Sequence, residues 1–168
     1  VSCFFTSLME NKGDTALATQ PYKNPDVPLP ERVENLLSLM TIEEKVGQML
    51  QLSKVPKESK TIERIKEYHL GSLLNVIGGR RTNRLQKAAE ETRLGIPLLF
   101  GIDAVHGHSL WPGATVFPTQ LSLSCSWNPE LVEQVGQVCS KEMRATGVHW
   151  TFSPLLDVAR DVRWVCNN

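Results

Sequence analysis

The chain has 168 residues, of which 41% are hydrophobic and 21% are charged. This length is sufficient for a domain with a buried core, and the composition is ordinary for a globular protein. The 18 Lys and Arg residues balance the 18 Asp and Glu residues, so no net charge attracts nucleic acid or an anionic membrane surface. No apolar stretch approaches the roughly 20 residues that span a bilayer. Composition and charge therefore argue against nucleic-acid and membrane partners.

The cysteines show no pattern of a metal site or of a disulfide framework. They lie far apart, without a C-x-x-C pair, and we interpret them as scattered free thiols: Cys3, Cys125, Cys139 and Cys166. The segment Val1–Leu8 is mildly apolar but lacks the positive charge that precedes the apolar core of a secretory signal. The compartment is therefore not assigned. We interpret both ends of the chain as arbitrary, as in a fragment or an imperfect gene model.

Residues 1–30 are predicted to form an irregular leader, because the stretch from 9 to 30 is polar and rich in proline. Helical periodicity begins after it, with apolar residues at Val33, Leu36, Leu37 and Met40. Thr41 and Glu44 then have the spacing of a capping box, which predicts the start of a second helix. The apolar face of that helix is predicted to consist of Ile42, Val46, Met49 and Leu50.

From residue 49 onward, strands and helices are predicted to alternate. Short apolar runs predict strands at 49–52, 71–77, 96–103 and 149–158. Helical patterns lie between them at 61–68 and 83–93, and a long helix follows Asn128 as its N-cap and ends before Gly147. Near-continuous apolar strands alternating with helices are typical of an α/β fold with a parallel sheet.

Two arrangements fit this alternation: about half of an eight-stranded (β/α)8 barrel, truncated, or a small doubly wound sheet. No G-x-G-x-x-G follows the first strand, which argues against a dinucleotide-binding version of the second arrangement. The connection Ala104–Trp127 is much longer than the roughly 2–6 residues of an ordinary connection. Because the loops after barrel strands build the active site, this loop is a candidate functional segment.

The segment Gly101–Gly107 (GIDAVHG) holds the strongest candidate side chain. Asp103 is predicted at the carboxyl end of a strand, where its carboxylate can accept hydrogen bonds from the hydroxyl groups of a ligand. The alternative is that Asp103 caps or braces the loop that follows. A metal site of Asp103, His106 and His108 matches no known ligand spacing. A catalytic triad with Ser109 lacks the G-x-S-x-G context, and we interpret His106 as hydrogen-bonded within its own loop.

A second polar segment, Arg160–Trp164, follows the last predicted strand. Arg160 or Arg163 has a carboxylate nearby in the sequence with which it can pair, either Asp157 or Asp161. The indole of Trp164 offers a large flat surface on which a sugar ring can stack. The alternative is a structural ion pair with Trp164 as a loop anchor.

Six segments, in this order, resemble glycoside hydrolase family 3: LMTIEEKVGQM at 39–49, GSLL at 71–74, RLGIP at 93–97, GIDAVHG at 101–107, Phe117-Pro118 and Arg160-Asp161. The resemblance covers Tyr22 to Trp164 and is greatest to β-glucosidases and β-glucan exohydrolases. It implies a (β/α)8-type barrel and a retaining enzyme that hydrolyses terminal β-linked glucose from oligosaccharides or glycosides. β-Xylosidase and N-acetylglucosaminidase are the rival specificities.

The same resemblance implies which residues act. The family's nucleophile, acid/base residue and Lys-His pair match no position here, so we expect no catalytic residue in this chain and no cofactor. Asp103 matches the aspartate that binds sugar hydroxyls in the innermost subsite. We expect Asp103 to be the main ligand of a β-glucoside or β-glucan oligosaccharide, with secondary contacts from Arg163, Trp164 and His106.

Residues 31–164 are thus predicted to form the N-terminal half of a family 3 barrel, and 165–168 an aberrant end. The family usually reads R-D-P-R-W-G-R, whereas this chain reads R-D-V-R-W-V-C from Arg160 to Cys166. Val-Cys can be encoded by GTATGT, which resembles the start of an intron. Alternatives are a non-catalytic sugar-binding remnant and a truncated gene product. We also expect self-association through the exposed barrel edges.

Overall fold

The computed structural model describes residues 20–53, 57–156, 160, 161 and 163. The chain divides into two compact units, Val1–Val46 and Gly47–Asn168. Among the described residues, no helix is both long enough and apolar enough to cross a membrane.

The first unit contains a 3₁₀ helix, η1 (Pro21–Lys23), the helix α2 (Leu29–Leu39) and most of the helix α3 (Ile42–Gln48). The described end of the predicted leader is therefore partly helical, which corrects the expectation of an irregular segment up to residue 30. Proline explains the error, because it suits the first turn of a helix, where its missing N–H is not needed. The Asn35 side chain joins the two elements by accepting a hydrogen bond from the Tyr22 N–H at 3.2 Å.

The capping box predicted at the start of α3 is confirmed. The Thr41 N–H donates to the Glu44 carboxylate at 2.9 Å, and the Glu44 N–H donates to the Thr41 hydroxyl oxygen at 3.2 Å. This reciprocal pair gives the buried Glu44 carboxylate a hydrogen-bond donor. Ile42 and Val46, by contrast, remain exposed, so this part of the predicted apolar face is not buried by the described residues.

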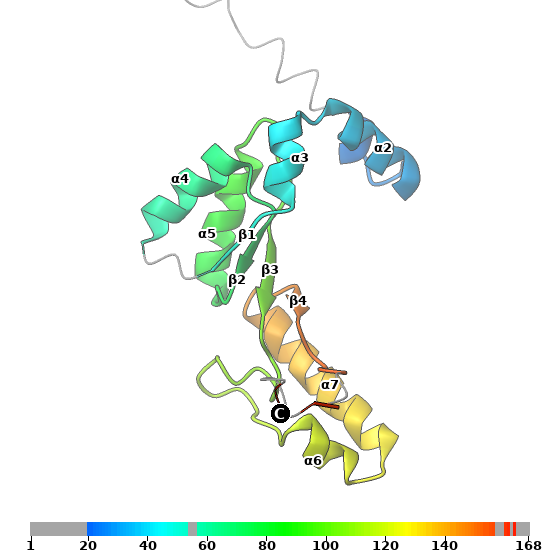
Figure 1. Ribbon diagram of the computed structural model, residues 1–168. Coiled ribbons are helices and arrows are strands. Elements are labelled where there is room, and N and C mark those ends of the chain that lie inside the picture. The colour runs from blue at the N-terminus through cyan, green and yellow to red at the C-terminus, as the bar shows by residue number, and fades with distance from the viewer. Residues whose placement is uncertain (1–19, 54–56, 157–159, 162, 164–168) are drawn as a thin grey trace, which may run out of the picture. The chain divides into compact units, whose positions relative to one another are not determined.

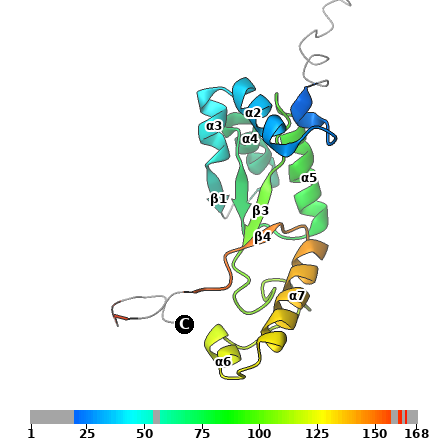
Figure 2. The ribbon, with the colours of Figure 1, turned by 90° about the vertical axis from the view of Figure 1, so that its right-hand side faces the viewer.

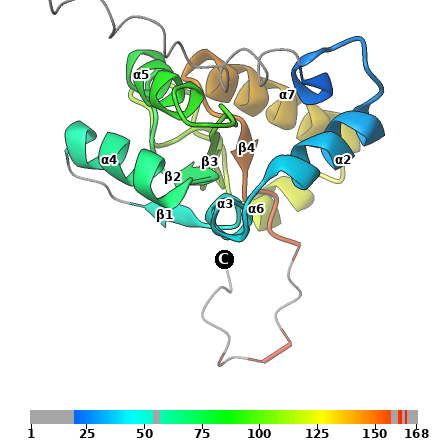
Figure 3. The same cartoon turned by 90° about the horizontal axis from the view of Figure 1, so that it is seen from above.

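The second unit is built on one parallel sheet, with the strands in the order β1-β2-β3-β4. The strands are β1 (Gln51–Ser53), β2 (Ser72–Leu74), β3 (Leu99–Ile102) and β4 (Trp150–Thr151). The main helices that connect them are α4 (Glu58–Tyr68), α5 (Gly79–Glu90) and α7 (Pro129–Ala145). Figures 1 and 3 show the sheet, with these three helices along the same side of it. The predicted parallel α/β fold is confirmed.

The strands are shorter than the apolar runs predicted. The second strand ends at Leu74, because Asn75 has a φ of 57° and leaves the extended conformation. The third strand ends at Ile102, immediately before Asp103. The fourth strand consists only of Trp150–Thr151. Residues 157–159 of its predicted span lie outside the described residues.

Two clusters of buried side chains hold the helices against the sheet. The first joins Leu73 and Phe100 of the sheet to Ile65 of α4 and to Leu85 and Ala89 of α5. The second packs the end of β3 against α7 and consists of Ile102, Ala104, Cys139, Met143 and Val148 (Figure 2). Cys139 is buried and Cys125 exposed, both as free thiols, as predicted. Cys3 and Cys166 lie outside the described residues.

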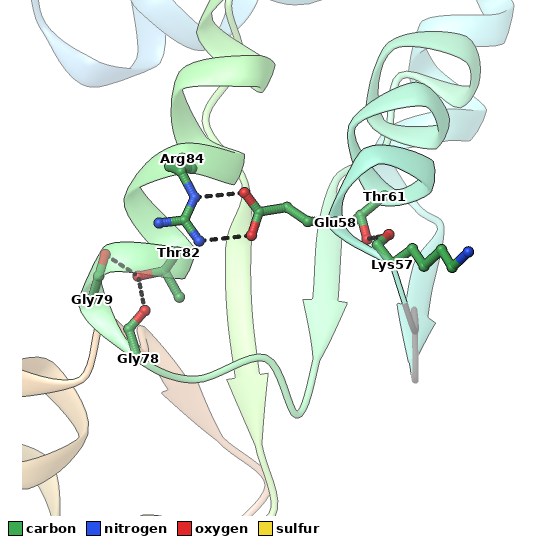
Figure 4. A network of polar contacts seen from close by, with 7 residues as sticks. All are labelled: Lys57, Glu58, Thr61, Gly78, Gly79, Thr82 and Arg84. Atoms are coloured by element: carbon green, nitrogen blue, oxygen red, sulfur yellow. Dashed lines mark hydrogen bonds and ion pairs between the residues drawn. The ribbon is translucent and has the colours of Figure 1, made fainter.

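Polar contacts join the outer surfaces of α4 and α5 (Figure 4). The Arg84 guanidinium makes two hydrogen bonds to the Glu58 carboxylate, at 2.5 and 2.7 Å. The hydrogen bond from Arg84 lowers the pKa of Glu58. Because this pair is exposed to solvent, it contributes little to stability. At the start of α5, the Thr82 hydroxyl donates to the backbone oxygen of Gly79 at 3.2 Å.

The face of the sheet opposite α4 and α5 is apolar and open. Leu99, Trp150 and Phe152 are each about 40–48% exposed there. A cavity of about 440 Å³ lies on this face and is lined by Gln48, Gln51, Ser72, Leu99, Trp150 and Phe152, among others. The indole of Trp150 lies where a Cβ on Gly101 would be, so the ring covers the middle of β3.

A close approach of two backbone segments at Gly71 gives a testable prediction. The Gly71 N–H donates to the Gly47 oxygen at 3.0 Å, and a Cβ on Gly71 would collide with the carbonyl oxygen of Gln48. Gly71→Ala should lower the free energy of unfolding by about 1–3 kcal/mol, as overpacking does. Urea denaturation followed by circular dichroism measures this.

Gly136→Ala is the matched control. It lies within α7, where no atom would contact the added Cβ, so this change should stabilise the chain by about 0.5–1 kcal/mol. If both alanine variants had the same free energy of unfolding, the steric explanation for Gly71 would be contradicted.

Candidate functional site

Asp103 lies directly after the last residue of β3, at the carboxyl end of the parallel sheet. The next residue is fixed, because the Ala104 N–H donates to the Thr151 hydroxyl oxygen at 3.2 Å. This bond ties the exit of β3 to β4 beside it. The Asp103 side chain is exposed, and among the described residues no hydrogen bond or ion pair holds its carboxylate. The described part of the chain thus offers no bracing contact that would explain an aspartate here.

His106 is half-buried in the loop that follows. Its carbonyl oxygen accepts a hydrogen bond from the Phe117 N–H at 3.0 Å, which closes the loop on itself. Between His106 and His108, Gly107 has a φ of 75°, and a Cβ there would meet the Phe117 ring at 2.8 Å. The backbone of His106 is thus bonded within its own loop, whereas the same interpretation of its imidazole stays a prediction.

The same loop is attached to α7 at two points. His108 is fully buried, and its Nε2 lies 2.8 Å from the Thr146 hydroxyl oxygen. Further along, the Thr115 N–H and hydroxyl donate to the Glu142 carboxylate at 3.1 and 2.9 Å. The sequence suggests His108 only as a member of a metal site and predicts neither contact. His108 and Thr146 are 38 residues apart in the chain, so no local sequence pattern predicts their contact.

Burial gives His108 a pH dependence that can be measured. The pKa of its imidazole lies below the ordinary value of 6.5, because burial disfavours the charged form. Between the lowered pKa of His108 in the folded chain and its ordinary pKa of 6.5 in the unfolded chain, the unfolded chain binds more protons. The free energy of unfolding should therefore fall as pH drops below 6.5. The pKa values of Glu58, Glu91 and Asp161 are lowered from 4.5, 4.5 and 3.8 by their basic partners, so these groups titrate below this window.

Urea midpoints measured at about pH 7 and about pH 5.5 test this expectation. The wild-type chain should lose stability between the two, and His108→Gln should lose less. An equal loss in the variant would show that another group is responsible.

The loop contains a short helix that the sequence analysis did not predict, α6 (Gln120–Ser124). Thr119 caps it by accepting a hydrogen bond from the Ser122 N–H at 3.1 Å. The Gln120 side chain donates to the Ser153 hydroxyl at 3.0 Å and accepts from the Leu155 N–H at 2.9 Å. The loop is therefore also attached to the segment that follows β4.

In the second predicted segment, Arg163 pairs with Asp161 through hydrogen bonds of 2.9 and 2.5 Å. These bonds, together with one from the Arg163 N–H, lower the pKa of Asp161 to about 2. No contact between described residues joins Arg163 to Asp103. Trp164 and Asp157 lie outside the described residues.

The positions of these side chains also bear on the metal alternative. His108 is fully buried and bonded to Thr146, whereas the Asp103 side chain is exposed. In the described ranges, no group of three or more His, Cys, Asp or Glu residues is arranged to hold a metal ion.

Comparison with known proteins identifies the family. The profile described as "Glycosyl hydrolase family 3 N terminal domain" matches residues 41–168. The chain belongs to glycoside hydrolase family 3. The match includes the loop that carries Asp103, His106 and His108, and it begins at the capping box of α3.

Individual family 3 proteins agree with this assignment. The chain is 37% identical to the periplasmic beta-glucosidase of Salmonella typhimurium over 79% of its length and 17% of that protein. It is 33% identical to a putative beta-xylosidase of Formosa agariphila, over 89% and 22%. The structure of a beta-glucosidase from Listeria innocua in complex with isofagomine matches with a TM-score of 0.65 and 40% identity, over 80% and 19%. The chain thus spans about a fifth of these relatives.

Proposed function

We propose that this chain forms the N-terminal half of a retaining β-glucosidase barrel that hydrolyses terminal β-linked glucose from oligosaccharides or glycosides. The observation that carries the proposal is the Asp103 carboxylate, exposed at the carboxyl end of β3 within a family 3 match. Parallel barrels bind their substrates at this edge of the sheet. The names of the relatives, periplasmic beta-glucosidase among them, support the same activity.

Asp103 is proposed as the main sugar ligand. A carboxylate that is bonded to none of the described residues can accept hydrogen bonds from two neighbouring hydroxyl groups of a terminal β-glucoside, and bonds to a charged acceptor are the stronger kind. His106, Arg163 and Trp164 are proposed as secondary contacts. Two guanidinium nitrogens of Arg163 are bonded to Asp161, and the third, which has no hydrogen bond to a described residue, is proposed to donate to a sugar. Trp164 is proposed as a stacking surface.

A chimera tests whether this chain can work as half of such an enzyme. Residues 41–164 would replace the matching segment of the Listeria innocua β-glucosidase, whose structure matches 80% of this chain with a TM-score of 0.65. The chimera should hydrolyse an aryl β-glucoside well above the buffer rate, because the rest of the parent enzyme supplies both catalytic carboxylates. A correctly folded chimera without activity would contradict the proposal, provided that the parent enzyme is active in the same assay.

The same chimera separates β-glucosidase from β-xylosidase specificity. The Formosa relative, at 33% identity, is the observation that favours the second. If the chain carries a glucose subsite, the chimera should prefer the aryl β-glucoside to the aryl β-xyloside. A reversed preference, measured as the ratio of the two kcat/KM values, would favour the β-xylosidase assignment.

Self-association of the isolated chain is a further prediction. In the described part of the chain, the edges of β1 and β4 are unpaired and the open face of the sheet exposes Leu99 and Trp150. Unpaired strand edges and apolar surface favour association between copies. Light scattering should detect dimers or larger species. A monodisperse monomer that melts cooperatively would contradict this expectation.

A further inference from the structure

We propose that His108 is a positioning residue that holds the loop after Asp103 against the C-terminal end of α7. This inference rests on the proposed role of Asp103 in sugar binding. His108 lies five residues after Asp103 in a stretch whose backbone is already constrained at both ends. The Ala104 N–H is bonded to Thr151, and Gly107 is packed against Phe117. Fixing His108 therefore limits the positions that the Asp103 backbone can take.

The hydrogen bonds around Thr146 define the tautomer of His108. The Thr146 hydroxyl has one proton, and the carbonyl oxygens of Met143 and Glu142 lie 2.9 and 3.2 Å from it. When the hydroxyl donates to one of these oxygens, it can only accept from His108. The imidazole then carries a proton on Nε2 and donates it to Thr146 across 2.8 Å.

The other tautomer is less favourable. Its proton would be on Nδ1, which is buried and has no hydrogen-bond partner in the described part of the chain. A buried N–H without an acceptor is rarer and costlier than a buried lone pair. The imidazolium form would carry the same unpaired proton together with a buried charge. The carboxylate of Glu142 opposes this penalty only as the weaker effect.

A second contact between the loop and α7 supports the proposed attachment of the loop. Thr115 donates to Glu142, which lies in α7 one turn before its C-cap residue Thr146. The loop is thus attached at His108 and at Thr115 to the C-terminal end of one helix. A hydrogen bond of defined direction orients the loop, whereas an apolar side chain of similar size would only fill the space.

Three variants separate orientation from packing: His108→Gln, His108→Leu and Thr146→Val. Glutamine places an N–H donor near the position of Nε2, so it should keep the loop in place. Leucine fills the space without a donor, and valine removes the acceptor. Amide hydrogen exchange at Thr115 and Phe117 should become at least tenfold faster in His108→Leu and Thr146→Val and change little in His108→Gln.

Two readouts test the proposal without any sugar. Nitrogen-15 spectra of the 168-residue chain should show His108 neutral and protonated on Nε2 at neutral pH. A proton on Nδ1 would overturn the proposal, as would unchanged exchange in His108→Leu. In the chimera described above, His108→Leu should raise KM for the aryl β-glucoside about tenfold and leave kcat nearly unchanged.

The chimera also distinguishes this inference from the role of Asp103. If Asp103→Asn left KM unchanged while the exchange results held, the sugar-binding assignment would fail and the loop attachment would stand. If exchange in all three variants matched the wild type, the attachment would fail whatever the kinetics of Asp103→Asn.

Discussion

The 168-residue chain on its own is expected to hydrolyse an aryl β-glucoside at the buffer rate. A retaining glycosidase needs two carboxyl groups about 5–5.5 Å apart, one as nucleophile and one as acid/base. The resemblance to family 3 places neither of them within these residues. The chain spans 17% of the periplasmic β-glucosidase that it resembles. Without either carboxylate, the expected loss is the whole enzymatic acceleration, which is at least about 10⁶-fold.

The assay needs a control for contaminating activity, because traces of a host β-glucosidase would be visible at this sensitivity. Residual turnover should be the same in the wild-type chain and in Asp103→Ala. Turnover abolished by a substitution within the chain would show that a complete active site assembles here, by self-association or otherwise.

Local rules predicted those parts of the fold in which short-range interactions decide the structure. The spacing of Thr41 and Glu44 predicts the capping box, and Asn128 followed by Pro129 predicts the N-cap of α7; both are confirmed. The parallel order of the strands followed from the alternation of apolar runs with helices. The apolar run that ends at Asp103 predicts it at the end of a strand, and Asp103 directly follows the last residue of β3.

Long-range contacts explain what the sequence did not predict. The second strand stops early because Asn75 takes a positive φ and donates to the Gly101 oxygen at 2.9 Å, a pairing that no local pattern reveals. The attachment of the loop through His108 joins positions 38 residues apart. The helix α6 lies in a stretch rich in turn-forming residues, and its Gln120 side chain bonds to a segment more than 30 residues away.

In the chimera, Asp103→Ala should lower kcat/KM for the aryl β-glucoside by about 30- to 5,000-fold. This corresponds to about 2–5 kcal/mol of transition-state binding, the expected cost of removing a charged acceptor and leaving sugar hydroxyl groups unpaired. The fold should survive, because the side chain is exposed and no contact with the described residues depends on it. Steady-state kinetics and thermal melting on one preparation measure both effects.

The bracing alternative predicts the opposite pair of results for Asp103→Ala: a lower melting temperature and near-normal kcat/KM per folded molecule. Ser109→Ala is the matched control, since this exposed side chain lies in the same loop and its removal should change neither quantity. Asp103→Asn keeps the shape of the side chain and one acceptor oxygen but removes the charge, so its kcat/KM should lie between those of wild type and Asp103→Ala. Unchanged kcat/KM in both Asp103 variants would end the assignment of this carboxylate to sugar binding.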